Sequence, residues 1–191
     1  ACEARLAQVV AGHTPILSEP AGETLAAGGK RLRPLLVFCC APEATRGGDG
    51  VLAAASAVEL VHMATLVHDD IIDEASLRRG RPTVSQAKGP DVALRVGDFL
   101  FARAFSELTR AGEPRAVQAL AASALDLSRG ELLQQAAAHD LDLTEDAYLE
   151  RCRGKTASLF AVACRLGAMI GGAGADAEER VAAFGEHVGL A

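Results

Sequence analysis

The sequence predicts an all-α protein that forms a single domain over residues 1–191. Aromatic residues make up only 4% of the chain, Trp is absent and Ala is abundant. Ala is the strongest intrinsic helix former, whereas aromatic and β-branched clusters favour strands. A chain of 191 residues is also long enough to bury one substantial core. Composition therefore favours helices packed around one core.

The first part of the chain predicts short helices separated by Pro and Gly. Residues 1–17 show a loosely helical pattern, and Pro15 and Pro20 predict a break in it. Gly28–Gly29 predicts the end of the next short helix, and Pro34 suits the first turn of the helix that follows. We therefore expect helix boundaries at these positions.

An apolar run at 35–41 predicts a buried helix, and a loop rich in Gly and charge follows at 43–50. Cys39 and Cys40 lie in this run, and we interpret them as reduced core residues. The five cysteines show no paired CxxC spacing, which argues against a zinc site or a disulfide framework. Cysteine usage thus indicates a cytoplasmic protein.

Longer helices follow in the second part of the chain. Segment 51–75 is the most helical, because it is rich in Ala and contains neither Gly nor Pro. Thr144, followed by two acidic residues, predicts an N-cap. Turn residues such as those at 112–114 and 171–174 separate further helical patterns, which cover 91–110, 115–138, 145–153, 156–170 and 176–191.

An acidic motif, DDIID at 69–73, is the strongest chemical feature. At about 100° per residue, Asp69 and Asp73 fall within about 40° of each other on a helix, and Asp70 lies one turn before Asp73 on the same side. Three converging carboxylates repel one another unless a cation lies between them, and hard oxygen ligands suit Mg²⁺. Taken alone, the cluster could equally be an exposed acidic face or be paired with arginines.

A polar stripe extends the motif along the same helix. His62 lies seven residues before Asp69, and Thr65 occupies the turn between these two residues. Glu59 lies one turn before His62. Within an otherwise apolar helix, this line predicts a face that borders a polar cavity. A histidine in such a position is more often a core residue, but its polar neighbours favour a role in binding.

Two dense basic groups flank this helix, GGKRLRP at 28–34 and RRGRPT at 78–83. Arg offers a bidentate fork to phosphate oxygens, and Gly lets the backbone approach a ligand closely. The net charge of −6 excludes a broad basic face for nucleic acid, so these groups predict binding of small polyanions. Either group alone could be a solvated loop. The segment is not a Walker A loop, since Thr24 replaces its first glycine.

A third candidate is the pair Lys155–Thr156, which precedes the apolar residues Leu159 and Phe160. We expect it at the N-terminus of a helix, where phosphate groups bind favourably. No signal peptide is visible, and Arg165 interrupts the most apolar late segment, so we expect no transmembrane segment.

Together, these segments resemble the trans-prenyl diphosphate synthases, and long-chain bacterial polyprenyl and geranylgeranyl diphosphate synthases in particular. The resemblance covers nearly the whole chain and is carried by GGKRLRP at 28–34, ELVHMATLVHDDIIDEASLRRGRPT at 59–83, VGDFLFARAF at 96–105, GELLQ at 130–134 and GKTASLF at 154–160. It implies an isoprenoid-synthase-type helical bundle with a central cavity, a magnesium-dependent prenyltransferase activity and, commonly, a homodimer.

The resemblance also implies a role for individual residues. Isopentenyl diphosphate would be held by Lys30, Arg33, His62 and Arg79. The allylic diphosphate would be held by Arg78, Lys155 and Thr156. Mg²⁺ would be bound by Asp69 and Asp73 with Asp70 in support, and the three aspartates and Lys155 would carry the catalysis.

Product length depends, in the resembled family, on the residues just before the acidic motif. Ala64 and Thr65 occupy these positions and are both small. Because side-chain volume sets pocket depth, they predict an open tunnel and products of about four isoprene units or longer.

The family's second aspartate-rich motif does not occur in the sequence, and the run GEHVGLA at 185–191 resembles the segment that leads into it. The chain begins at Ala1 rather than Met and ends at Ala191 within an apolar pattern, so we expect a fragment, and the absent motif indicates that its C-terminal part is missing. Three alternatives stay open: a non-catalytic subunit of a heteromeric synthase, a terpene cyclase, and a helical protein without a ligand. The intact DDIID motif argues against the first, and two separate cation sets argue against the second.

Overall fold

The computed structural model describes residues 1–11 and 13–191, and it confirms the all-α prediction. The helical elements are α1 (Cys2–Val10), α2 (Pro15–Ala26), α3 (Leu32–Cys40), α4 (Asp49–Ile72), α5 (Val84–Lys88), α6 (Pro90–Thr109), α7 (Pro114–Ala136), α8 (Glu145–Cys152), the π-helical turn η1 (Arg153–Ala157), α9 (Ser158–Gly171) and α10 (Ala175–Leu190). One small antiparallel hairpin, β1 (Leu77–Arg78) and β2 (Arg81–Pro82), follows α4.

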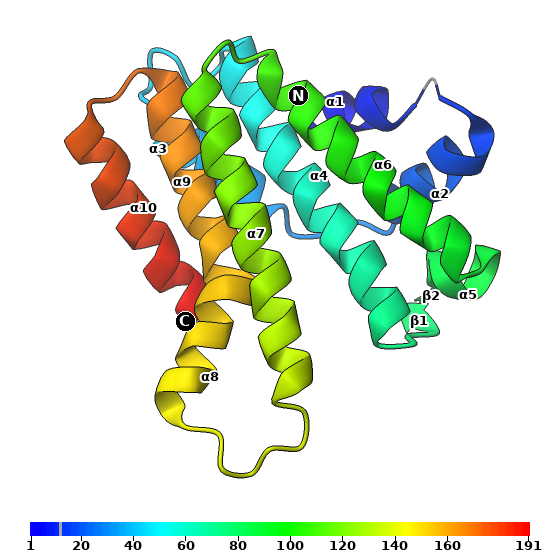
Figure 1. Ribbon diagram of the computed structural model, residues 1–191. Coiled ribbons are helices and arrows are strands. Elements are labelled where there is room, and N and C mark those ends of the chain that lie inside the picture. Colours follow the sequence, from blue (N-terminus) through cyan, green and yellow to red (C-terminus); the bar gives the residue numbers. More distant parts are fainter. Residues whose placement is uncertain (12) are drawn as a thin grey trace.

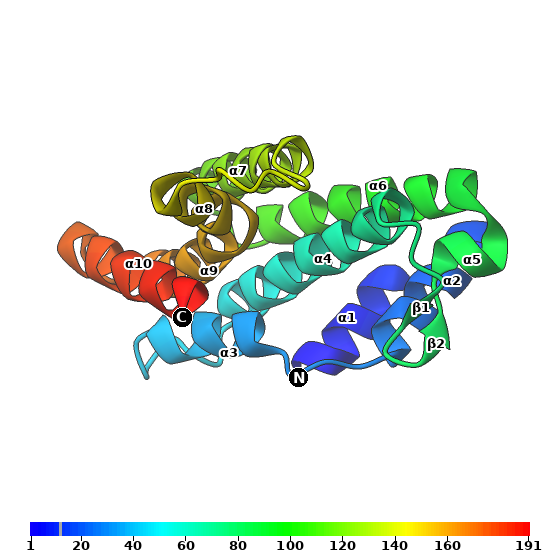
Figure 2. The same cartoon turned by 90° about the horizontal axis from the view of Figure 1, so that it is seen from below.

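Helix α4 is the central element of the bundle (Figures 1 and 2). It packs most extensively against α6, and it also contacts α3 and α9. Helix α9 in turn packs against α3, α7 and α10. Figure 1 shows the β1–β2 hairpin at the C-terminal end of α4. The turn η1 directly precedes α9 in the chain. The predicted site residues lie on the hairpin, on η1, on the C-terminal half of α4 and at the start of α3.

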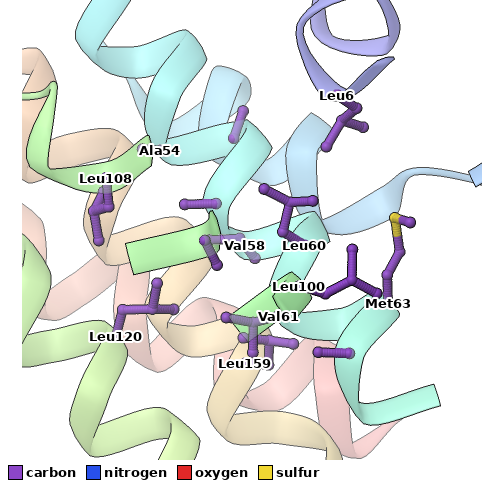
Figure 3. Close-up of a cluster of buried hydrophobic side chains, with 14 of the residues drawn as sticks. Leu6, Ala54, Val58, Leu60, Val61, Met63, Leu100, Leu108, Leu120 and Leu159 are labelled. Atoms are coloured by element: carbon purple, nitrogen blue, oxygen red, sulfur yellow. The ribbon is translucent and has the colours of Figure 1, made fainter. Parts of the chain in front are cut away.

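The core forms because α4 buries small residues on several sides. Ala53, Ala54 and Ala57 are fully buried, which lets neighbouring helices approach α4 closely. Figure 3 shows the larger side chains of this core, which come from five helices: Leu6, Val58, Leu60, Val61, Met63, Leu100, Leu108, Leu120 and Leu159. Truncating one of these leucines to Ala would destabilise the fold by about 2–5 kcal/mol.

The prediction that no segment has the length and apolar composition of a membrane span is wrong for one helix. By these two properties alone, Asp49–Ile72 could cross a membrane. However, 72% of its most apolar window is buried within the protein. A fully enclosed helix needs apolar residues all round, so its composition is explained by its central position.

Several predicted boundaries need correction. Pro15 and Pro20 do not bracket a break, because Pro15 begins α2 and Pro20 lies inside it. The helix predicted at 51–75 runs from Asp49 to Ile72. The N-cap role of Thr144 is confirmed, since its hydroxyl accepts a hydrogen bond from the backbone N–H of Ala147.

The predicted core position of two cysteines is also wrong. Cys39 is exposed and Cys40 is half-buried, because only Pro34 and Val37 of α3 are fully buried. Gly167 of α9 explains how closely α3 packs: a Cβ there would lie 2.1 Å from the backbone oxygen of Val37.

Candidate active site

The acidic motif lies at the C-terminal end of α4, within the electrostatic influence of Lys155 on η1 and Glu131 on α7. Asp69 is half-buried, and Asp73 is the exposed C-cap residue. The pKa of Asp69 is raised to about 6, first by burial and then by the carboxylates of Glu131 and Asp73, against a lowering effect of Lys155. A divalent cation beside Asp69 would offset the unfavourable ionisation of this carboxyl group.

The predicted convergence of three aspartates is not found. Asp70 is buried, and its Oδ1 accepts a hydrogen bond from Nε of Arg78 at 2.8 Å. The same oxygen forms an ion pair with Nη2 of Arg78 at 2.7 Å. Among the residues that the structure describes, no group of three His, Cys, Asp or Glu side chains is arranged to hold a metal ion. The helix end explains the difference: the chain turns back after Ile72, and the hairpin brings Arg78 against Asp70.

The donor set still fits magnesium. Mg²⁺ is usually held by one or two carboxylates together with substrate phosphates and water, not by a cage of protein ligands. Asp69 and Asp73 supply two such carboxylates on one helix face.

The β1–β2 hairpin returns the basic segment 78–83 towards the first basic segment. Its turn needs positive φ angles, which Arg79 (52°) and Gly80 (76°) adopt. The hydroxyl of Thr83 donates a hydrogen bond to the backbone oxygen of Ala75 at 2.7 Å and caps α5, which fixes the base of the hairpin. The geometry of these local contacts places the Arg79 side chain beside α2 and α3.

The two basic segments meet at Gly29. A Cβ at this position would lie 2.9 Å from Nη1 of Arg79 and 3.2 Å from Nη1 of Arg31. A side chain at this position would displace the ends of these two flexible arginines, whereas glycine leaves room for both guanidinium groups beside the backbone. The interpretation that Gly serves close approach in this segment is consistent with this contact.

His62 lies among four guanidinium groups. Its pKa is lowered to about 3, first by burial and then by the nearby charges of Arg33, Arg79, Arg78 and Arg31. The imidazole is therefore neutral at physiological pH, and it can donate one hydrogen bond without adding charge. Arg31 and Arg78 are paired with carboxylates, so the positive charge that a polyanion would stabilise here comes from Arg33 and Arg79, which form no ion pair among the residues that the structure describes.

The four arginines are not equally engaged. Arg31 is held by Glu3 at 2.5 Å and by the buried Glu59 at 2.7 Å. Arg33 stacks over the ring of Phe160 at 4.5 Å, and its buried Nε has no hydrogen-bond partner in the structure. An unpaired buried donor is unfavourable, so Arg33 is prepared for an anion. Lys30 is exposed in the loop before α3.

A cavity of about 370 Å³ opens beside these groups. Its wall includes Arg31, His62, Asp70, Arg78 and Arg79, together with the apolar Met63. A second cavity of about 380 Å³, between α7, α9 and α10, contains none of the predicted site residues. The electrostatic arrangement, and not the cavity size, identifies the first as the candidate site.

Lys155 and Thr156 lie on η1, not at a helix N-terminus. The chain runs through α8, η1 and α9 without a break, so the N–H groups at this point are used within the helix. The structure brings Lys155 close to Asp69 and pairs its ammonium group with Glu131. The prediction that a free helix N-terminus binds phosphate here is therefore wrong. The side chain of Lys155, however, lies close to the acidic motif.

Ala64 is fully buried and Thr65 is half-buried on α4. The hydroxyl of Thr65 donates to the backbone oxygen of His62 at 2.8 Å, so it is satisfied within its own helix. Neither residue lines the 370 Å³ cavity. Their proposed influence on product length stays a prediction.

Sequence reasoning missed roles for Glu131 and Phe160. Glu131 belongs to the segment GELLQ, and Phe160 to GKTASLF, and both segments were recognised without assigning these residues. A signal was present for Glu131, because it is a charged residue in a largely apolar stretch, but its partner could only be known from the crossing of α7 and η1.

Comparisons with known proteins agree with this arrangement. The family model for polyprenyl synthetase matches residues 14–191. The chain is 41% identical over 190 residues to heptaprenyl diphosphate synthase component 2 of Geobacillus stearothermophilus, covering 100% of this chain and 59% of that protein. It is 33% identical over 164 residues to octaprenyl diphosphate synthase of Escherichia coli, covering 86% of this chain and 51% of that protein.

Solved structures agree as well. A decaprenyl diphosphate synthase from Rhodobacter capsulatus superposes with a TM-score of 0.94 at 39% identity, covering 99% of this chain and 58% of that one. A polyprenyl synthase from Caulobacter crescentus, in complex with calcium and isoprenyl diphosphate, superposes with a TM-score of 0.93 at 38% identity, covering 98% of this chain and 57% of that one.

The helical bundle with its paired acidic and basic groups defines an isoprenoid-synthase fold. The chain belongs to the polyprenyl synthetase family. It spans about half to three fifths of the length of the relatives named above.

Proposed function

We propose that the protein is a prenyltransferase that condenses isopentenyl diphosphate with an allylic diphosphate, giving a longer all-trans prenyl diphosphate and inorganic diphosphate. The observation that carries this proposal is the pairing of two opposite environments at one end of α4. Four arginines lie near a neutral His62, and a carboxylate pair, Asp69 and Asp73, lies about two to three turns further along the helix.

In this proposal the basic centre binds isopentenyl diphosphate. Lys30, Arg33, His62 and Arg79 would hold its phosphate oxygens, since guanidinium and ammonium groups match phosphate charge and geometry. The unpaired Nε of Arg33 supports this assignment.

The allylic diphosphate would bind on the acidic side. Asp69 and Asp73 would hold Mg²⁺, with Asp70 acting indirectly by orienting Arg78. Lys155, Thr156 and Arg78 would contact the diphosphate itself. When bound, Mg²⁺ supplies charge stabilisation for a departing diphosphate.

The reaction follows from these positions. The C–O bond of the allylic diphosphate breaks, and its electron pair leaves with the diphosphate, which Lys155 and Arg78 stabilise. The double bond of isopentenyl diphosphate attacks the allylic cation, and loss of a proton to the released diphosphate completes the step. The apolar wall residues beside the basic centre, such as Met63 and Leu66, keep water from the cation.

The finer parts of the proposal are a product of about four isoprene units or longer, set by side-chain volume, a homodimer and a cytoplasmic location. The small size of Ala64 and Thr65 supports the product length.

A second candidate is a subunit of a heteromeric synthase. It is supported by two relatives, 41% and 36% identical to this chain, that are both named heptaprenyl diphosphate synthase component 2. In this alternative the chain would need a second polypeptide for activity. A terpene cyclase would not need two separate sets of cations.

The test is product analysis by mass spectrometry. The protein, expressed at its full natural length, is incubated with isopentenyl diphosphate, one of three allylic primers (geranyl, farnesyl or geranylgeranyl diphosphate) and Mg²⁺. Elongated prenyl diphosphates that require Mg²⁺ support the proposal. Products that form only after a second polypeptide is added support the heteromeric alternative, and cyclised hydrocarbons contradict both.

A further inference from the structure

The contact between α7 and η1 brings an unassigned carboxylate to the edge of the acidic motif. Gly130 and Gly154 make this contact possible: a Cβ at Gly130 would lie 2.3 Å from the backbone nitrogen of Lys155, and one at Gly154 would lie 2.9 Å from the backbone oxygen of Asp126. The backbones of α7 and η1 are therefore in direct contact at these two glycines. The residues next to these glycines, Glu131 and Lys155, are forced to be neighbours.

Glu131 forms an ion pair with Lys155 in a largely enclosed setting. The exposed fractions of the side chains are 12% for Glu131 and 25% for Lys155. Both carboxylate oxygens of Glu131 are buried, and neither has a hydrogen bond of acceptable geometry in the structure. A carboxylate can accept several hydrogen bonds, so this pair leaves most of that capacity unused. In the pair between Asp70 and Arg78, by contrast, the carboxylate accepts a hydrogen bond of good geometry from Nε of Arg78.

Lys155 thus lies between two competing anionic partners. On one side is Glu131, and on the other is Asp69, whose ionisation is favoured by the charge of Lys155. An ammonium group on a flexible four-carbon chain can move between such partners by rotating about its side-chain bonds. Without Glu131, the nearest compensation for Lys155 would be the aspartates of the acidic motif.

We propose that Glu131 is a positioning residue that holds Lys155 away from Asp69 and Asp73 until a diphosphate arrives. This inference rests on the proposed function. While Lys155 is held, the two aspartates stay open to a divalent cation. When the diphosphate binds, its oxygens replace Glu131 as the partner of Lys155.

Binding of Mn²⁺ alone tests this inference, with electron paramagnetic resonance to measure free Mn²⁺ in the absence of any substrate. The protein at its full natural length is compared with Glu131→Gln, Lys155→Gln and the double variant. Glu150→Gln is the matched control, because Glu150 lies in the neighbouring α8 and pairs with Arg129 instead. Thermal unfolding of each variant verifies that it is folded.

Glu131→Gln is expected to weaken Mn²⁺ binding by about fivefold or more, since coupled charges commonly interact on this scale. In the Lys155→Gln background the same change is expected to have less than about a twofold effect, because no competing ammonium group remains. Glu150→Gln is expected to bind Mn²⁺ like the wild type.

Two results would overturn the inference alone. One is wild-type affinity in Glu131→Gln. The other is an equal loss in both backgrounds, which would show that Glu131 acts on the cation directly. If the wild-type protein bound no Mn²⁺, the metal site of the proposed function would fail together with the inference.

Discussion

At the scale of single residues, the candidate site is defined by which charges are paired and which are not. Asp70 and Arg31 are committed to partners within the protein, whereas Asp69, Asp73 and Arg33 are not saturated. We expect the unsaturated residues Asp69, Asp73 and Arg33 to control ligand binding, and the paired residues Asp70 and Arg31 to control the shape of the site.

Asp69→Asn should abolish most of the activity. The amide removes a charged oxygen ligand that a hard divalent cation prefers, and we expect kcat to fall by at least about 100-fold. The measurement is steady-state formation of prenyl diphosphate. Asp91→Asn, an exposed acid in the first turn of α6, serves as the control and should retain wild-type activity. Near-normal turnover of Asp69→Asn would remove the acidic motif from the mechanism.

His62 should make the stability of the protein depend on pH. Its pKa is about 3 in the folded protein and close to 6.5 when unfolded, so the unfolded state binds more protons between these values. The free energy of unfolding should therefore fall as the pH drops below about 6.5. Urea unfolding at pH 7 and pH 5 should show a loss larger by about 1–2 kcal/mol in the wild type than in His62→Gln. Parallel losses would contradict the burial of a neutral imidazole.

The sequence alone could predict which site residues lie close together where their spacing along one helix determines it. Asp69 and Asp73 are four residues apart on one helix, so their approach needed no tertiary information. The pairing of Asp70 with Arg78 could not be predicted, because it depends on the path of the chain through the β1–β2 hairpin.

At the scale of secondary-structure elements, the π-helical turn η1 organises the site. It lies within a continuous helical segment, and its five residues include Gly154 and Lys155. Turns of this kind are often found at functional sites. Composition gave no signal for it, since the residues 153–157 are compatible with an ordinary helix start. The breaks at Gly28–Gly29 and 171–174 were predicted because Gly supplies the positive φ angles that end α2 and α9.

Gly130→Ala should disrupt the crossing of α7 and η1. The added Cβ would lie 2.3 Å from a backbone nitrogen, so one of the two helices must move. We expect a loss of about 1–3 kcal/mol in the free energy of unfolding, together with lower activity. Gly22→Ala in α2 is the matched control, because nothing lies within 4 Å of its Cβ, and it should be neutral or stabilising by up to about 1 kcal/mol. Equal behaviour of the two variants would contradict the close contact.

At the scale of the whole molecule, helices distant in sequence form one site. The first basic segment leads into the first turn of α3, the second follows α4, and Lys155 lies about 75 residues further on. The resemblance to a known family predicted this assembly, whereas periodicity and composition could predict only the separate helices. The close approach of Arg79 to Gly29 shows that the two basic segments, far apart in the sequence, meet in the fold.

Ala64→Phe should shorten the product. Ala64 is fully buried in the bundle, and under the proposed function a phenyl ring at this position would reduce the volume open to a growing prenyl chain. Mass spectrometry of the products should show a shift to shorter chains. Because the larger side chain could also impair folding, Ala64→Leu and a thermal unfolding measurement accompany it. An unchanged product distribution in a folded variant would rule out this position as a determinant of length.

The four guanidinium groups around His62 have a consequence for handling the protein. Arg31 and Arg78 are each paired with a carboxylate, whereas Arg33 and Arg79 form no ion pair among the described residues, so a bound polyanion would offset the repulsion between these two guanidinium groups. Inorganic diphosphate should then raise the melting temperature even without Mg²⁺, and high salt should diminish that rise. Differential scanning fluorimetry can measure both effects. Phosphate in a purification buffer would thus act as a competing ligand as well as a stabiliser.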